Sequence, residues 1–271
     1  PKASLSYNFT DRLQLSYNVQ SNERVSRIAM ISDASIRTNS MEWTVGSPEL
    51  KPNRDTYQTL RLSYADSRLQ ADLQGYYKIC RHPNMAVYER TANDKFIYTQ
   101  RNQKEIDALQ VSGYVNYWLL PEKLSVAGYG GLFRCFNFGT DYTHCYTSYF
   151  VTGSLNAYLG NFSIQAYADN GWRFQEGETK GYNGSDVALK TSYRYKDWQF
   201  ALIWQQPLMK RYKMFETEIL NRNLQKQIAL YSTDRCNLVS LNISWRLNKG
   251  RKYRTINKTI QLKDSDTGII R

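Results

Sequence analysis

Residues 13–20 read LQLSYNVQ, a stretch in which apolar side chains at every second position alternate with polar ones. The same alternation occurs at 69–78, LQADLQGYYK, and at 239–246, VSLNISWR. Successive side chains of a β-strand point to opposite faces of the sheet. Each stretch therefore predicts a strand with one apolar and one polar face, and such strands recur from one end of the chain to the other.

The connections between these strands alternate between short turns and long segments. Bacterial outer-membrane barrels have short periplasmic turns and long extracellular loops, an alternation that the crossing connections of a β-sandwich do not produce. The breaks are made by turn-forming residues. The short connections fall at 10–12, 65–67, 121–122, 160–161 and 196–197, and the long ones at 21–54, 80–104, 137–145, 175–184 and 210–236.

We therefore predict an all-β fold, namely an antiparallel up-and-down transmembrane β-barrel to which this chain contributes about eleven strands. If the short turns are periplasmic, the last strand, near 237–247, leaves the C-terminus in the periplasm. That is where the end of a membrane barrel is expected.

The composition is compatible with membrane strands although the mean hydropathy is only -0.63. No run approaches the roughly 20 apolar residues of a spanning helix, but barrel strands keep a low mean hydropathy because only one face meets lipid. The 22 Tyr, 10 Phe and 6 Trp suit the aromatic girdles of a barrel. A soluble β-sandwich or a carbohydrate-binding surface is also rich in aromatic residues, so composition alone leaves both open.

Several large or charged residues fall on the polar face of the predicted strands. A small sandwich core would not tolerate such a set, because buried charge needs pairing, whereas a wide, hydrated or plugged lumen would. The alternative is the solvent-exposed outer face of a soluble sheet. The residues predicted to face the lumen are Arg61, Lys78, Trp118, Lys190 and Arg246.

The net charge of +12 predicts attraction to polyanions. The basic residues are spread over loops and turns, apart from one dense stretch at 249–254, KGRKYR. We expect outer-membrane lipid or lipopolysaccharide as the counterpart, and no nucleic acid. A merely solvated basic tail is the alternative.

The four cysteines are Cys80, Cys135, Cys145 and Cys236. They form no CxxC and no paired Cys/His spacing, so a zinc site has little support. Cys135 and Cys145 are placed to close a disulfide across one hairpin if the compartment is oxidising. Free thiols are the alternative.

We predict that the chain is not an enzyme. His82 and His144 fall in predicted extracellular loops, and the G-x-S-x-G pattern of a nucleophile elbow is absent. Asp141, His144 and Cys145 share one short loop, but three mixed groups of this kind do not by themselves predict a metal site. We therefore expect no catalytic residues, no bound metal and no cofactor.

Aromatic residues in the long connections are the candidates for ligand binding. Their rings could stack on a sugar or a chelate, or they could anchor the interface girdle and pack the loops together. The stretch 85–100 reads as a hairpin with its turn at Asn93 and Asp94, which we expect to project above the membrane. The candidate ligand-binding residues are Trp43, Tyr88, Tyr98, Tyr142, Trp172 and Tyr182, with Tyr212 in a similar position.

Residues 46–52, GSPELKP, precede a strand, a tight turn and a second strand that carries the pair Tyr76 and Tyr77. This arrangement resembles the G-N-P-x-L-K-P-E segment of TonB-dependent receptor barrels. Ser47 and Asn53 depart from that pattern.

The end of the chain is similar to the same family, in particular to the outer-membrane β-barrel group common in Bacteroidetes. Residues 243–250, ISWRLNKG, look like its closing strand and Lys-Gly exit. The polar tail that follows is a departure, because many other outer-membrane proteins end on an aromatic residue. We expect residues 1–248 to form the barrel wall and 249–271 to form either a periplasmic extension or a disordered segment.

The resemblance implies a barrel of about 22 strands with a plugged lumen, of which this chain is the C-terminal half. It implies a longer precursor that supplies the signal peptide, the energy-coupling box, the plug domain and the N-terminal barrel strands. The implied function is TonB-driven uptake of an unidentified ligand in the bacterial outer membrane, with the TonB complex bound through the N-terminal part. The alternatives are a surface-exposed or soluble β-protein that binds glycans through aromatic loops, and a structural barrel without transport.

Overall fold

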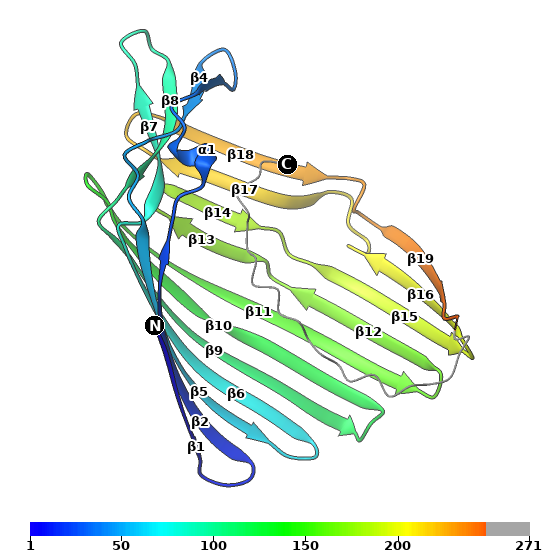
Figure 1. Cartoon of the computed structure of the whole chain (residues 1–271). Coiled ribbons are helices and arrows are strands. Elements are labelled where there is room, and N and C mark those ends of the chain that lie inside the picture. Colours follow the sequence, from blue (N-terminus) through cyan, green and yellow to red (C-terminus); the bar gives the residue numbers. More distant parts are fainter. Residues whose placement is uncertain (248–271) are drawn as a thin grey trace.

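The computed structural model describes residues 1–247, and its main element is one antiparallel sheet of eleven strands, which we call the wall. The strands follow one another around the wall in chain order, as predicted for an up-and-down barrel (Figure 1). The strand count confirms the prediction of about eleven. The wall strands are β1 (Lys2–Asn8), β2 (Leu13–Arg24), β5 (Asn53–Ala65), β6 (Leu69–Arg81), β9 (Glu105–Leu120), β10 (Leu124–Phe138), β11 (Thr143–Leu159), β12 (Phe162–Asp169), β15 (Val187–Tyr195), β16 (Trp198–Gln205) and β19 (Leu238–Trp245).

The register places the apolar residues of neighbouring strands on a common face. Leu62 on β5 pairs with Leu15 on β2 and with Leu73 on β6. Leu73 is 56% exposed, and Leu132 on β10 is 61% exposed. Among the described residues, no second sheet covers this apolar face. The apolar face is therefore the outer surface of the wall, as a lipid-facing barrel wall requires.

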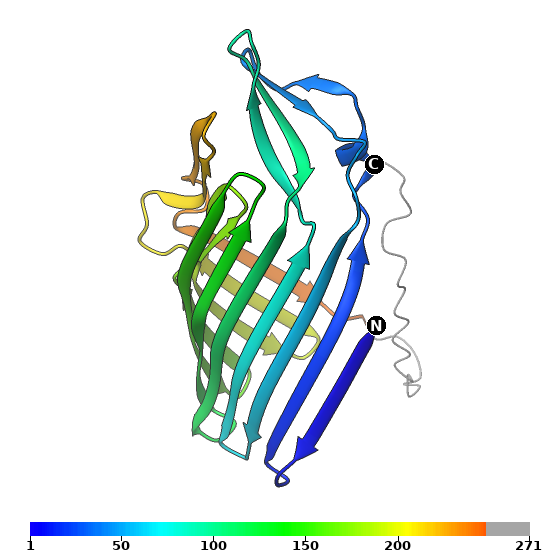
Figure 2. The same cartoon turned by 90° about the vertical axis from the view of Figure 1, so that its left-hand side faces the viewer.

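The opposite face of the wall is polar and concave. Arg61 on this face forms an ion pair with Asp72, with Nη2 and Oδ2 2.8 Å apart. Figure 2 shows the wall curving into a trough, with β1 and β19 as its two unpaired edges. The described sheet is therefore open, as expected of part of a larger barrel.

Two four-stranded sheets lie at the end of the wall opposite its short turns (Figure 1). We assign this end to the extracellular side, because the short turns of such barrels are periplasmic. Within residues 1–247, no helix is long and apolar enough to cross a membrane. The first sheet has the order β13 (Trp172–Glu176), β14 (Thr179–Asn183), β17 (Tyr212–Leu220), β18 (Gln225–Ser232), and the second has β3 (Ser35–Arg37), β4 (Glu42–Val45), β8 (Phe96–Asn102), β7 (Asn84–Arg90), preceded by the short helix α1 (Ile28–Ile31).

The structure confirms two local predictions and corrects a third. The hairpin expected over 85–100 is β7 and β8, and the strand expected near 237–247 is β19. The long connection expected at 137–145 is wrong, because the β10–β11 ladder continues to the pair of Phe138 with Thr143. Backbone groups that the loop would have exposed are therefore hydrogen-bonded in strands. The expected polar tail, 249–271, lies outside the described residues.

The cysteines are free thiols in the structure. Cys135 pairs with Tyr146, so Cys145 lies on the adjacent rung and points to the opposite face. Cys135 is buried on the concave side, whereas Cys145 is exposed on the outer side. This geometry favours the free-thiol alternative over a disulfide across the hairpin.

Candidate functional site

A cavity of about 620 Å³, which we call the lumen cavity, lies on the concave face at the extracellular end of the wall. It is bounded on the wall side by β2, β5, β6, β9 and β10, and on the other side by β13 of the first small sheet. Its volume is within the range of small-molecule sites. Both charged and aromatic side chains line it, so its chemistry depends on how they are held.

Asp55 is the centre of the charged part of the lumen cavity. Its side chain is 1% exposed, forms an ion pair with Arg24 Nε at 2.8 Å and accepts a hydrogen bond from the Tyr57 hydroxyl at 2.9 Å. Lys78 Nζ lies 3.4 Å from the same carboxylate, and Arg24 Nη2 donates to the Tyr57 oxygen at 2.8 Å. A buried carboxylate needs such partners. Asp55 thereby fixes two cations at the cavity edge.

The register explains why these four residues meet. Tyr57 pairs with Lys78 across β5 and β6, and Asp55 lies two residues from Tyr57, hence on the same face. Arg24 is the last residue of β2 and its side chain remains 63% exposed. Its Nε binds Asp55 and its Nη2 donates to Tyr57, and the remaining N–H groups can meet a ligand.

The apolar part of the lumen cavity is continuous with a small core. Cys80, Ile106 and Cys135 are buried together, and Met85 and Phe133 pack against them. Aromatic rings, among them Phe133 and Trp172, also line the cavity. Trp172 lies with its ring centroid 5.2 Å from that of Phe133 and 5.4 Å from that of Phe150.

Strand β13 is docked against the inside of the wall by three polar contacts. Ser148 Oγ donates to the Arg173 carbonyl at 2.9 Å, and Cys135 Sγ donates to the Gln175 carbonyl at 3.4 Å. The Gly177 amide donates to Asn137 Oδ1 at 2.9 Å. These contacts satisfy backbone groups at the edge of the small sheet and hold Trp172 over the lumen cavity.

The residues predicted to face the lumen lie on the polar face of the wall. Arg61 and Lys78 form the ion pairs described above, and the Trp118 ring lies 6.1 Å from that of Tyr158. Lys190 and Arg246 fall on the same face by strand alternation. Only Lys78 of this set lines the lumen cavity.

The predicted ligand-binding aromatics lie in both small sheets, apart from Tyr142 in the turn between β10 and β11, and only Trp172 of them lines the lumen cavity. Tyr88 and Tyr98 are brought together, with ring centroids 5.2 Å apart, and burial raises the pKa of Tyr88 to about 12. The others pack on charged or aromatic neighbours of their own. Trp43 lies beneath Arg37 and Lys95, Tyr142 stacks on His144, Tyr182 lies beneath Arg173, and Tyr212 is buried.

Sequence reasoning missed Arg24, Asp55 and Tyr57 as a group. The available signal was that Asp55, Tyr57 and Arg61 share one parity on β5 with an excess of polar side chains. What the cluster offers chemically is charge and hydrogen bonding. Among residues 1–247, no group of three His, Cys, Asp or Glu side chains is placed to hold a metal ion.

Comparisons with solved structures show where this architecture occurs. The chain is similar to the siderophore receptor PirA from Pseudomonas aeruginosa, with a TM-score of 0.61 at 13% identity over 91% of this chain and 42% of the receptor. It is also similar to the copper transporter OprC, with a TM-score of 0.59 at 13% identity over 79% of this chain and 34% of that protein. A third similar structure is a variant of the ferric enterobactin receptor PfeA from Pseudomonas aeruginosa in complex with enterobactin, with a TM-score of 0.55 at 12% identity over 78% of this chain and 35% of the receptor.

The chain thus spans less than half the length of each of these structures, and at such low identity the likeness shows the fold alone. The comparison with curated protein sequences gives no match. A model of the outer membrane protein beta-barrel family matches residues 1–245, which is nearly the whole described chain. The chain therefore belongs to the outer membrane protein beta-barrel family and is a protein of the bacterial outer membrane.

Proposed function

We propose that this chain forms the C-terminal part of the barrel wall of a receptor for TonB-driven uptake of a ligand. The lumen cavity carries the proposal, because it places fixed charges and an aromatic ring on the concave side of a wall whose apolar side faces outward. The fold shared with a siderophore receptor, an enterobactin receptor and a copper transporter supports it. The GSPELKP segment at 46–52 supports it too, because it resembles TonB-dependent receptor barrels. In this role the chain binds and passes a ligand and catalyses no reaction.

The unpaired edges of the wall define the first partner. Strands β1 and β19 each have one neighbour in the sheet, and an exposed strand edge favours pairing with further strands. We propose that the N-terminal barrel strands of the same precursor pair with both edges. A plug domain of that precursor would fill the concave side, and the TonB complex would act through the N-terminal part.

Lipid is the second partner. The outer face presents apolar side chains such as Leu132 and Val151, which are 61% and 56% exposed. Burying them in hydrocarbon is favourable. We propose that this face contacts outer-membrane lipid and that basic residues beyond it contact lipopolysaccharide.

The lumen cavity favours a ligand that carries negative charge beside a flat or apolar group. Three cations line it, Arg24, Arg27 and Lys78, against two carboxylates, Asp55 and Glu176. Asp55 is already occupied by two of the cations. Guanidinium groups bind carboxylate and similar anions with paired hydrogen bonds. Trp172 is the candidate aromatic contact.

The proposal is tested by comparing three strains that carry the whole precursor gene, a deletion of it, or the gene in a background without TonB. Compounds that cells remove from the medium are measured by mass spectrometry. A compound that only the first strain removes identifies the ligand and supports TonB-driven uptake. A structural barrel without transport predicts that the three media are the same, and that result would refute the proposal.

The lumen cavity is tested with a matched pair of variants at the same end of the wall. Arg24→Ala should lower the uptake rate at low ligand concentration by about tenfold, because it removes a charge-assisted contact. Arg54→Ala removes an arginine whose partner is Glu23, outside the cavity, and should leave uptake unchanged. Equal uptake by Arg24→Ala and the unaltered protein would show that the ligand does not use this cavity.

A further inference from the structure

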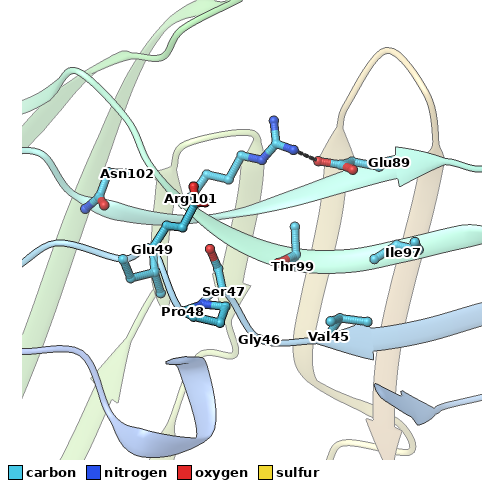
Figure 3. Close-up of a pocket in the computed structure, with 11 residues that line it drawn as sticks. Val45, Gly46, Ser47, Pro48, Glu49, Glu89, Ile97, Thr99, Arg101 and Asn102 are labelled. Atoms are coloured by element: carbon cyan, nitrogen blue, oxygen red, sulfur yellow. Dashed lines mark ion pairs between the residues drawn. The ribbon is translucent and has the colours of Figure 1, made fainter. Parts of the chain in front are cut away.

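A second hollow, of about 800 Å³, lies in the other small sheet beside β8 (Figure 3). It begins where β4 stops pairing with β8. The two strands run parallel through the pairs Glu42 with Phe96 and Thr44 with Tyr98. Strand β4 then ends at Val45, whereas β8 continues to Asn102. The hollow occupies the place that a longer β4 would have filled.

The chain is drawn away from β8 by helix α1 and its flanking residues. The Ser47 amide donates to the Met30 carbonyl at 2.7 Å. Gly46 is needed at this bend, because a Cβ there would collide with the carbonyl oxygen of Ser32. The diversion is therefore built into the loop and does not depend on a ligand.

The chain returns to β8 at Lys51. The Lys51 amide donates to Asn102 Oδ1 at 2.8 Å, and Asn102 Nδ2 donates to the Lys51 carbonyl at 3.0 Å. The Asn102 side chain thus forms with Lys51 the two hydrogen bonds that the backbone of a neighbouring strand would form. Residues 45–50 are left opposite only three residues of β8, 99–101, so the hollow is closed at both ends and open in the middle.

The open stretch of β8 presents backbone hydrogen-bonding groups. The Phe96 amide donates to the Met41 carbonyl at 2.8 Å, so its N–H and C=O point toward β4. In a strand the backbone groups of every second residue point the same way. The N–H and C=O of Gln100 and Asn102 therefore point toward the β4 side. In the continuing ladder the Gln100 N–H lies opposite the Val45 carbonyl, so the groups that face the gap are the Gln100 C=O and the Asn102 N–H. Within residues 1–247, no backbone hydrogen bond joins 46–50 to 100–102.

The side chains around this open edge are both apolar and charged. Ile97 on β8 and Val45 on β4 supply apolar side chains to the lining (Figure 3). Arg101 forms an ion pair with Glu89 at the rim, and the two side chains are 61% and 37% exposed. The guanidinium therefore has further N–H groups that a carboxylate can reach.

We propose that this hollow binds a short extended peptide with a free C-terminal carboxylate as an added strand beside β8. Peptides that add to an open sheet edge bind through main-chain hydrogen bonds. The three open residues, 99–101, span about 10 Å of extended chain, which is the length of a tripeptide. A peptide N–H would donate to the Gln100 carbonyl, a peptide carbonyl would accept from the Asn102 amide, and the C-terminal carboxylate would meet Arg101. This site lies outside the lumen cavity and does not depend on TonB-driven uptake.

The test uses the whole receptor in detergent and trialanine with free termini as the probe. Amide hydrogen exchange is measured across β7 and β8. Without peptide, the Asn102 amide should exchange faster than the amides of Thr99 and Arg101, which bond to β7. With saturating peptide, the Asn102 amide should become protected. Slow exchange at Asn102 without peptide, or no change on adding it, would overturn the proposal.

A matched pair of arginine variants tests the role of the rim. Arg101→Gln should weaken trialanine binding by about tenfold, because it removes the charged partner of the carboxylate. Arg90→Gln alters an arginine of the same hairpin that pairs with Asp94, away from the hollow, and should bind as the unaltered protein does. Equal weakening by both variants would show that only general charge attracts the peptide. Peptide binding is measured on the purified receptor and does not require uptake. The proposal of a peptide site and the proposal of TonB-driven uptake can therefore fail separately.

Discussion

The wall and the two small sheets are built from similar strands but are held together in different ways. In the wall, strands pair in chain order and the outer face is apolar, as at Leu73 and Leu132. In the small sheets, strands from separate connections pair with each other, as β14 does with β17 and β4 does with β8. The stability of the wall depends on the alternation of apolar and polar residues along each strand and on contact with lipid. The stability of the small sheets depends on contacts between segments that are distant in sequence.

The contact between the two small sheets makes this difference concrete. Lys226 on β18 donates to Glu42 on β4 at 2.7 Å, and its ammonium lies 5.7 Å from the centre of the Tyr88 ring. Asn223 Nδ2 donates to the Tyr88 carbonyl at 3.0 Å. Ion pairs and single hydrogen bonds thus join these sheets. Changes to lipid-facing residues should therefore damage the wall, and changes to specific pairs should damage the small sheets.

The largest effect is expected from a charge on the outer face of the wall. Val151 lies near the middle of β11 and is 56% exposed. Val151→Arg should destabilise the inserted barrel by about 2–4 kcal/mol, because the charge would lie in hydrocarbon. Thr152→Arg is the control, since Thr152 faces the concave side and pairs with Asp169. Urea unfolding of the precursor in lipid vesicles measures both, and equal losses would mean that the outer face is not lipid-facing.

The second effect should be confined to the small sheets. Lys226→Glu places two carboxylates together at a site where Glu42 is only 11% exposed, and should cost about 2 kcal/mol. The combined change of Glu42→Lys and Lys226→Glu restores opposite charges and should recover most of the loss. Limited proteolysis of the loops and amide exchange on β18 measure the result. A loss that the charge swap does not recover would show that the ion pair does not join the sheets.

The third effect concerns the turn between β13 and β14 and its contact with Tyr142 of the wall. Gly177, between these strands, has a φ of 58°, and a Cβ there would lie 2.8 Å from the Tyr142 hydroxyl oxygen. Gly177→Ala should cost about 1–2 kcal/mol of local stability from the left-handed conformation alone, with the collision added.

Gly160 is the control for Gly177, because its φ is 62° but a Cβ would meet nothing within 4 Å. Gly160→Ala should therefore show the backbone cost without the collision. The double variant with Gly177→Ala and Tyr142→Phe should recover the difference. Amide exchange on β14 measures the loss for the Gly177 variants, and amide exchange on β11 and β12 measures it for Gly160→Ala. An equal loss in the two alanine variants would mean that Tyr142 does not constrain the turn.

The same difference between regions decides what could be predicted from the sequence. Alternation is a property of neighbouring residues, so the wall strands and the hairpin at 85–100 were predictable. The pairing of Lys226 with Glu42 joins residues far apart in sequence, and no local period encodes it. The lumen cavity was only partly predictable, because Lys78 and Trp172 could be placed by face and loop, whereas the buried Asp55 needed the register of three strands.

The smallest effect concerns an ion pair within one small sheet. Lys213 Nζ lies 2.9 Å from Glu216 Oε2 on the surface of β17. The hydrogen bond from Lys213, with one from Gln227, lowers the pKa of Glu216 below its ordinary 4.5. The hydrogen bond to Glu216 raises the pKa of Lys213 above its ordinary 10.5.

The sign of the pH dependence follows from these two shifts. The contribution of Glu216 is complete above its ordinary pKa of 4.5 and is lost as pH falls through the lowered value. That of Lys213 is complete below 10.5 and is lost as pH rises through the raised value. Amide exchange, corrected for its intrinsic pH dependence, should therefore show β17 and β18 opening slightly in acid. The change should be small, because solvent screens an exposed pair. Glu216→Gln should abolish the acid step while β10 and β11 stay unaffected, and a step that persists in this variant would assign it to another group.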